Sequence, residues 1–283
     1  MPREGSERHV TLLWEDASEI VGLASGVVME SGKRYLTFAA VKPALRRQGL
    51  GTRLLNALEE KLTEGAEPPV KLECVFFNPV NLTWVVPGTP GHDHPNAPGV
   101  DVSIGGYLFL KNRGYRDWVQ QNSYYLPLAK YEYPEALAKK KEALAEEGIE
   151  ITVYDPAKHT GLEELMDALG SEDWKMHVMT NAARPDGGDP LLVVVSDGRC
   201  VGFTGPMAVQ PSGRGYFAGI GIHPDFRGRG AGKVLFGALC LGLKGLGAGY
   251  MTLFTGETNP ARNIYEAAGF KIVKTWADMR KEF

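Results

Sequence analysis

The sequence has few features of a secreted or membrane protein. Only three of its 283 residues are cysteine (Cys74, Cys200 and Cys240), and neither their number nor their spacing fits a disulfide framework or a metal site. No apolar run approaches the length of a bilayer span, and residues 1–8 do not have the pattern of a signal peptide. We therefore expect buried free thiols, a cytoplasmic location and no association with a membrane.

The sequence also lacks an excess of positive charge. Its 31 Lys and Arg residues face 34 Asp and Glu residues, which gives a formal net charge of −3. No overall basic field therefore favours nucleic acid as a partner. The composition, 43% hydrophobic and 23% charged, is that of an ordinary globular protein, and the length suits two compact domains.

One phrase occurs twice, at positions 41–51 (VKPALRRQGLG) and 222–232 (IHPDFRGRGAG). Each copy follows a β-branched and aromatic stretch and precedes an apolar pattern with helical period. A turn rich in glycine and arginine at a helix N-terminus favours an anion, most often phosphate. No Gly-Lys-Ser/Thr follows, which excludes a Walker loop, and the glycine spacing does not fit a dinucleotide-binding fingerprint. The repeat predicts two related domains.

The second copy has the clearer pattern of secondary structure. We expect strands at 149–154, 191–196, 200–209, 216–222 and 250–255, with closing strands at 270–273 and 276–280. Helices are expected at 158–169, at 174–183, from the turn to 246, and from Asn259-Pro260 to Gly269. Asp197-Gly198 predicts a tight hairpin turn.

The first copy follows the same order from its second strand onward, but its closing part differs. A loop at 86–98, rich in Pro, Gly, His and Asn, replaces the tight entry into the last helix, which resumes near Ser103. The strand and helix pair that begin the second copy have no room before Arg46. We expect domains at 1–130 and 149–283, joined by a helical connector at 131–148.

The turn and the later segment 259–270 (NPARNIYEAAGF) together closely resemble the GCN5-related N-acetyltransferase (GNAT) superfamily. The resemblance covers 150–283 and, more weakly, about 10–128. It implies an α/β fold with a mixed sheet, built as two tandem acyl-CoA N-acyltransferase domains of which the first lacks its N-terminal strand and helices. The implied co-substrate is acetyl-CoA, and no metal is expected.

The resemblance implies that each turn holds the pyrophosphate of CoA, since glycines let the backbone approach and arginines add charge. The strand at 219–222 would hold the pantetheine arm and polarise the thioester carbonyl. The implied cofactor-binding residues of the second copy are Gly221, Ile222, Arg227, Gly228, Arg229, Gly230, Ala231, Gly232 and Asn259. Those of the first copy are Val41, Arg46, Arg47, Gln48, Gly49, Leu50 and Gly51.

Tyr265 is the expected catalytic residue, because the family places a tyrosine four residues before the glycine at 269 to protonate the CoA thiolate. The alternative is a packed aromatic side chain. Asn259 would contact the pantetheine, cap the helix, or do both. In the first copy Leu110 and Ile104 stand where Tyr265 and Asn259 stand, so this domain is expected to support the active one or cover its acceptor groove, and CoA binding by it stays open.

No general base stands out in the sequence. Candidates on the expected acceptor side are Glu172, Asp173, His177 and Glu257, each of which is also a typical surface residue. Trp174 could line the acceptor cavity or belong to the core. His92-Asp93-His94 could ligate a metal, but such neighbours rarely close a coordination shell alone, so we interpret them as a solvated loop.

The sequence thus predicts an N-acetyltransferase in which a primary amine attacks acetyl-CoA directly at the C-terminal domain. The alternatives are a non-catalytic CoA-binding sensor or scaffold, and a bifunctional enzyme with both domains active, a layout that also resembles the mycothiol synthase branch of the family. The acceptor, a small molecule or a peptide amine, stays open because acceptor contacts come from variable helices and loops. We expect a monomer or a homodimer.

Overall fold

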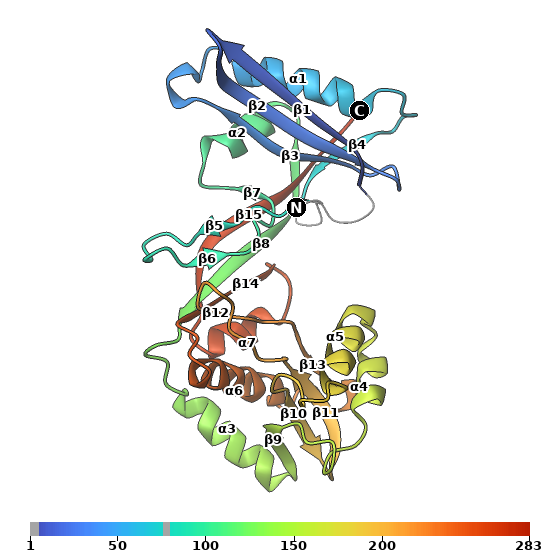
Figure 1. Ribbon diagram of the computed structural model, residues 1–283, viewed down its shortest axis with the longest axis vertical. Coiled ribbons are helices and arrows are strands. Elements are labelled where there is room, and N and C mark those ends of the chain that lie inside the picture. Colours follow the sequence, from blue (N-terminus) through green and yellow to red (C-terminus); the bar gives the residue numbers. More distant parts are fainter. Residues whose placement is uncertain (1–5, 76–79) are drawn as a thin grey trace. The chain divides into compact units, whose positions relative to one another are not determined.

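The computed structural model describes residues 6–75 and 80–283, which form two compact units. Unit 1 comprises Met1–Trp84, His94–Asn122 and Lys274–Phe283, and unit 2 comprises Val85–Asp93 and Ser123–Val273. The repeats and the units therefore do not coincide at the end of the chain: the last ten residues belong to unit 1. Figure 1 shows the elements of each unit.

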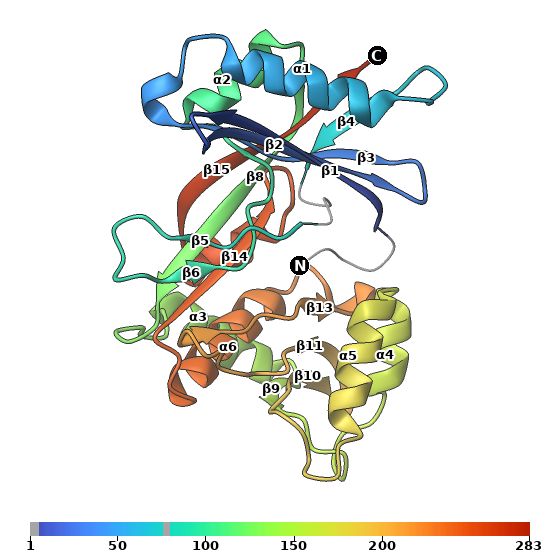
Figure 2. The same cartoon turned by 45° about the horizontal axis from the view of Figure 1, so that its top comes forward.

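Unit 1 is built on strands β1 (Ser6–Asp16), β2 (Glu19–Met29), β3 (Arg34–Val41) and β4 (Lys71–Cys74). Ala17 and Ser18 both have positive φ, as the turn of a two-residue hairpin requires. Helix α1 (Leu50–Thr63) covers one face of these strands (Figures 1 and 2) and buries its leucines against β2. Its apolar side chains recur every three or four residues, which explains the helix and the face it buries.

The remaining elements of unit 1 follow β4 in the chain. They are β5 (Trp84–Val85), β6 (Asp93–His94), β7 (Val100–Asp101), α2 (Gly105–Asn112) and β8 (Arg116–Pro127), of which some residues belong to unit 2. The final strand β15 (Lys271–Glu282) pairs antiparallel with β4 through residues 279–282 and with β7 through Trp276 and Ala277. The first core therefore contains Ala277 and Met279 from the end of the chain.

Unit 2 contains a four-stranded sheet in the order β13-β11-β10-β9. Its strands are β9 (Ile149–Val153), β10 (Leu192–Ser196), β11 (Arg199–Thr204) and β13 (Ile220–Ile222). Helices α4 (Leu162–Leu169) and α5 (Glu172–Ala182) lie on one face and α6 (Ala231–Gly245) on the other (Figure 2). Two separate buried clusters fill these faces.

Unit 2 contains two further strands and two further helices. They are α3 (Glu135–Glu146), β12 (Arg214–Gly215), β14 (Tyr250–Gly256) and α7 (Arg262–Ala267). Strand β12 pairs in parallel with β14, whereas β13, four residues further along, pairs with β11. The chain thus changes its pairing partner between residues 215 and 220.

Several sequence predictions are confirmed. The fold is mixed α/β, and Asp197 and Gly198 form the β10–β11 turn with positive φ. Within residues 6–75 no helix precedes α1 except one short turn at Pro43–Leu45, so the first repeat lacks counterparts of α4 and α5. The three cysteines are free and buried, and burial raises the pKa of Cys200 to about 11.

Other predictions are wrong in detail. The two expected closing strands at 270–273 and 276–280 are one continuous strand, β15, whose pairing with β4 and β7 the local sequence does not encode. The expected strand 216–222 is broken, because Gly219 adopts a φ of +153°, which L side chains rarely adopt. The expected strand 200–209 ends at Thr204.

No helix among the described residues has the length and hydropathy to cross a bilayer.

Candidate functional site

The repeated phrase forms the same turn in both units. In unit 2 a short 3₁₀ turn (Pro224–Phe226) separates β13 from α6, and in unit 1 an equivalent turn (Pro43–Leu45) separates β3 from α1. The Nε of Arg227 donates to the Ile222 carbonyl at 3.0 Å, and the Nε of Arg46 donates to the Val41 carbonyl at 2.9 Å. Each arginine therefore closes its own loop through one nitrogen.

Glycine is needed at the residue that opens each helix. Gly230 and Gly49 precede α6 and α1 with φ of +86° and +85°, in the left-handed region. Ala231 and Leu50 then begin the helices, whose first N–H groups have no intrahelical partner. The turn in each unit thus presents free amide donors at the positive end of a helix dipole.

The two turns differ at a position where the backbone has a positive φ. Gly228 has a φ of +79°, and Arg47 occupies the matching place with a φ of +64°. A non-glycine residue with this φ is strained by about 1 kcal/mol. The side chain of Gln48, next in unit 1, donates weakly to the Ala44 carbonyl at 3.4 Å. The first turn keeps its shape at some conformational cost.

The closing helices of the two units meet the turns in the same way. A β-carbon at Gly232 would lie 3.3 Å from Ile264 of α7, and one at Gly51 would lie 3.6 Å from Phe109 of α2. Ile264 and Phe109 are therefore equivalent, and so are their next neighbours, Tyr265 and Leu110. The structure gives Leu110 the position in unit 1 that Tyr265 has in unit 2.

In unit 2 the strand that leads into the turn has an open edge. β13 is the edge strand of its sheet and, among the described strands, pairs only with β11. The next strand in the chain, β14, pairs with β12 and not with β13. The His223 amide donates to Val201 of β11, so by alternation the Ile222 amide points to the open edge. A β-carbon at Gly221 would lie 2.5 Å from Leu169 of α4, on one face of the sheet, so the small size of Gly221 serves packing.

The break between β12 and β13 forms the inner end of this open edge. Thr204 donates through Oγ1 to the Gly219 carbonyl at 2.8 Å, which fixes the break. A β-carbon at Gly219 would lie 2.6 Å from Nε1 of Trp174, so the indole of α5 covers this point. Trp174 also packs edge-on against Phe203, so it lies both against the core and at the break.

Tyr265 lies in an aromatic cluster on α7. Its ring is 5% exposed and lies 5.0 Å from the ring centre of Phe236, 6.0 Å from Phe217 and 5.9 Å from Tyr124. Burial, aided by Tyr124, raises the pKa of Tyr265 to about 12. Its hydroxyl makes no hydrogen bond with the residues that the structure describes. Both interpretations from the sequence, acid and packed aromatic, fit this environment.

The other candidate side chains are spread around unit 2. Asn259 accepts from the Ala261 amide at 2.9 Å, in N-cap geometry, although α7 begins only at Arg262. The four candidate bases, Glu172, Asp173, His177 and Glu257, are all exposed. His177 contacts the Asp173 carbonyl on its own helix at 2.7 Å.

Unit 1 has a large cavity at its own turn. Its volume is about 860 Å³, within the usual size range of ligand pockets. The lining includes Val41, Arg46, Arg47, Gly49 and Gly51 from the strand and turn, and Ile104, Leu108 and Phe109 from the closing helix region. Ile104 and Leu108 are 52% and 61% exposed, so the cavity wall is apolar and open to solvent.

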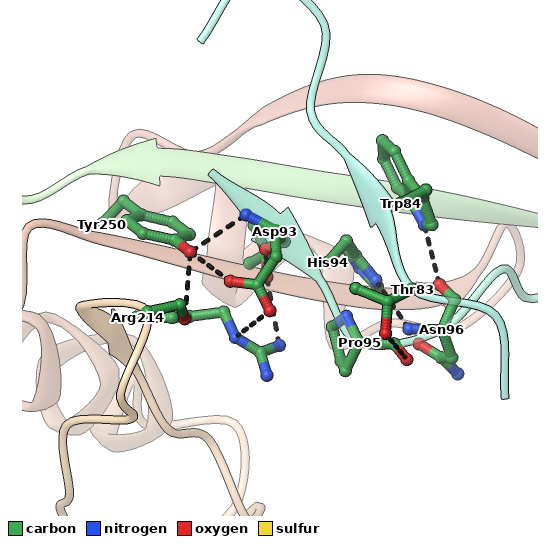
Figure 3. A network of polar contacts seen from close by, with 10 residues as sticks. Thr83, Trp84, Asp93, His94, Pro95, Asn96, Arg214 and Tyr250 are labelled. Atoms are coloured by element: carbon green, nitrogen blue, oxygen red, sulfur yellow. Dashed lines mark hydrogen bonds and ion pairs between the residues drawn. The ribbon is translucent and has the colours of Figure 1, made fainter. Parts of the chain in front are cut away.

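The loop at 86–98 is packed, so its interpretation as a solvated loop is wrong. Within unit 2, His92 stacks on Tyr250 with ring centres 3.8 Å apart, and its Nδ1 lies 2.8 Å from the Tyr125 hydroxyl. Tyr250 donates to the Asp93 carboxylate, and the Nε of Arg214 lies 3.8 Å from the same carboxylate (Figure 3). Within unit 1, His94 is fully buried and stacks on Trp84. Among the described residues no cluster of three metal-ligating side chains occurs.

The charge on Asp93 is stabilised by these contacts. Burial alone would raise the pKa of Asp93, but hydrogen bonds from Tyr250 and Ser212 and the charge of Arg214 outweigh it and lower the pKa. No local pattern indicates this cluster, because Asp93 and Tyr250 are 157 positions apart. Thr204, which fixes the break, was missed for a similar reason: its partner Gly219 lies beyond a loop.

Comparison with known proteins identifies the repeated pattern. The family model for the acetyltransferase (GNAT) family matches residues 2–80 and 156–270, which is more than half of the chain. A mycothiol acetyltransferase of Propionibacterium freudenreichii subsp. shermanii is 35% identical over 112 residues. That match covers 38% of this chain and 35% of the relative, so it spans about a third of the length of the curated relative.

Solved structures share the fold along nearly the whole chain. A GCN5-related glucosamine N-acetyltransferase region of a fungal multi-domain β-N-acetylglucosaminidase is 18% identical with a TM-score of 0.62, covering 97% of this chain and 33% of the other. A tandem GNAT protein from the clavulanic acid biosynthesis pathway is 16% identical with a TM-score of 0.57, covering 97% and 83% of the two chains. At these identities the likeness concerns the fold alone.

Proposed function

Because the chain belongs to the acetyltransferase (GNAT) family, we propose that it transfers the acetyl group of acetyl-CoA to a primary amine, with the chemistry in unit 2. The observation that carries the proposal is the divergence of β13 from β14 beside the glycine turn of α6. A strand edge with unpaired amides next to a phosphate-type turn suits a long ligand with a pyrophosphate at one end and a thioester at the other.

In the proposed reaction the neutral amine attacks the thioester carbonyl and forms a tetrahedral intermediate. The Ile222 amide, which points to the open edge, donates to the developing oxyanion. The carbon–sulfur bond then breaks, and the thiolate takes a proton from the Tyr265 hydroxyl. The attacking nitrogen, which carries a positive charge in the intermediate, loses a proton to solvent and gives the neutral amide, and Tyr265 regains a proton from solvent. A pKa of about 12 keeps this phenol protonated at neutral pH, which an acid requires.

For unit 1 we propose CoA binding without turnover. The support is the matching turn, with Gly49 and Arg46 in the geometry of Gly230 and Arg227, and the cavity of about 860 Å³ beside it. Leu110 has no proton to donate at the place of Tyr265. We retain 1–130 and 149–283 as the two repeats, joined by the connector 131–148.

The acceptor amine is proposed to enter at the strand break covered by Trp174. The test incubates the full chain with acetyl-CoA and a panel of amines (polyamines, amino sugars, amino acids and peptides) and measures free CoA thiol and acetylated product. Amine-dependent thiol release with an acetylated product supports the proposal. Acetyl-CoA binding with no turnover on any amine would instead favour a CoA sensor or scaffold.

A further inference from the structure

The connector helix α3 is fixed along α6 within unit 2. The Tyr133 hydroxyl, just before α3, donates to the Val234 carbonyl of α6 at 2.9 Å. A β-carbon at Gly237 of α6 would lie 2.8 Å from Tyr133 and 2.9 Å from Leu137. Figure 1 shows the two helices side by side. Small residues on α6 thus let the connector approach closely, and this sets the position of every side chain on that face of α3.

Lys140 lies on this face, one helical turn beyond Leu137. A β-carbon at Gly230 would lie 2.9 Å from its Cε and 3.4 Å from its Cγ, so the lysine side chain runs over the glycine that opens α6. The ammonium is one bond beyond Cε. Lys140 is half-buried, and no ion pair or hydrogen bond of its ammonium is found with the described residues.

The other cations near the turn belong to the repeat itself, and Lys233 among them is exposed on the first turn of α6. Arg229 lies 3.4 Å from the Glu147 carboxylate, and the Nε of Arg227 is bonded to Ile222. Lys140 therefore brings an uncommitted positive charge to free helix amides, from a segment outside the repeat. Unit 1 has no counterpart, since no described atom lies within 4 Å of a β-carbon at Gly49.

We propose that Lys140 is a phosphate-binding residue of unit 2, which contacts the pyrophosphate of CoA at the N-terminus of α6. This inference rests on the proposed function of that turn. An ammonium and several amides converging on one phosphate form charge-assisted hydrogen bonds, which are stronger than neutral ones. The connector helix would then give unit 2 a tighter CoA site than unit 1, although the two turns are alike.

The test measures protection from amide hydrogen exchange in the full chain as CoA is added, because peptides from 227–235 and from 46–54 report the two turns separately. Lys140→Ala should raise the CoA concentration for half-maximal protection of 227–235 by about fivefold, as expected for loss of one charged contact that is partly open to solvent. Protection of 46–54 should not change. Lys141→Ala, an exposed neighbour on the same helix, is the matched control and should change neither.

Dephospho-CoA, which keeps the pyrophosphate and lacks the 3′-phosphate, tests which of these groups Lys140 contacts. The loss caused by Lys140→Ala should persist with this probe, and its disappearance would overturn the assignment to the pyrophosphate. Unchanged or tighter binding by Lys140→Ala would also overturn the proposal, the latter by making α3 a cover that competes with CoA. If the unchanged chain shows no protection of 227–235 by CoA, the proposed function of the turn fails instead.

Discussion

The two turns have nearly the same backbone, yet the closing helices differ at one position, where unit 2 has a tyrosine hydroxyl and unit 1 has a leucine. Gly49 and Gly230 agree within one degree in φ, and the loop-closing bonds of Arg46 and Arg227 differ by 0.1 Å. At the next point of contact, on the closing helix, the side chains are Leu110 and Tyr265. The turns alone therefore do not distinguish the two units, and the difference between the units lies on the closing helices.

The two turns also differ in the residues that surround them. The first turn opens onto a cavity of about 860 Å³ with exposed apolar residues on its wall. The second turn is flanked by the connector helix, with Lys140 over Gly230 and Glu147 beside Arg229. An open apolar cavity favours binding through apolar contacts, whereas a positive charge at the turn favours a ligand that carries phosphate. The comparison leads to four predictions about the two halves of the chain.

The largest effect is expected from blocking one turn at a time. Gly230→Val places a β-branched side chain at a φ of +86° and against Lys140, so the amides that we propose to bind the pyrophosphate should be displaced. We expect kcat/KM for acetyl-CoA to fall by about 1000-fold. Gly49→Val has the same φ in open space and should change kcat/KM less than twofold. Steady-state kinetics of both variants decide the matter, and a larger loss in Gly49→Val would make unit 1 the catalytic one.

The next effect concerns the residue that separates the closing helices. Tyr265→Phe keeps the ring packing against Phe236 and removes the proton, so kcat should fall about 100-fold with little change in the KM of acetyl-CoA. Because burial raises the pKa of Tyr265 to about 12, its ionisation should not reduce wild-type kcat below about pH 10.5. Tyr124→Phe, in the same cluster, is the control. Wild-type rates in Tyr265→Phe would make the tyrosine structural.

Features set by local sequence could be predicted, and features set by distant partners could not. The Asp197-Gly198 turn and the helices after Gly49 and Gly230 follow from residues within a few positions, because positive φ and helix starts are local requirements. The match of Leu110 with Tyr265 was also available from the order of elements. The family resemblance made the pyrophosphate interpretation of the turn possible.

Long-range packing explains what was missed. In β15, Trp276 and Ala277 pair with β7 and residues 279–282 pair with β4, and the polar residues Lys274 and Thr275 gave no local reason to expect one strand across 271–282. The loop with His92 and Asp93 looked solvated because its partners, Tyr250 and Arg214, lie far along the chain. The contact of Lys140 with Gly230 depends on how closely α3 and α6 pack, which no spacing in the sequence expresses.

A smaller effect is expected where the first repeat departs from the second, at the loop that carries Asp93. Asp93→Asn removes the partner of Arg214, whose side chain is 9% exposed, and should lower the free energy of unfolding by about 2 kcal/mol at pH 7. The pKa of Asp93 is lowered on folding, so this contribution is present above the unfolded pKa near 4 and is lost as pH falls through the folded value.

Urea denaturation of the full chain at several pH values measures this difference. The gap between wild type and Asp93→Asn should narrow below about pH 4. Ser212→Ala removes one of the hydrogen bonds that lower the pKa of Asp93, together with a 3.3 Å contact with Tyr250, and leaves the carboxylate and Arg214 in place, so it should cost less than Asp93→Asn. A gap that does not change with pH would mean that the carboxylate charge contributes nothing and that the loop is held by ring stacking of His92 alone.

The smallest effect is a reciprocal exchange at the one position where the turns differ in backbone strain. Arg47→Gly should stabilise unit 1 by about 0.5–1 kcal/mol, because glycine adopts a φ of +64° without the strain of a β-carbon. Gly228→Arg should destabilise unit 2 by a similar amount, since no described atom crowds that site and strain alone changes. Hydrogen exchange of the α1 and α6 amides reports each unit. Arg47→Ala removes the charge and keeps the β-carbon, so stabilisation by this control as well would assign the effect to charge repulsion with Arg46 instead of to φ.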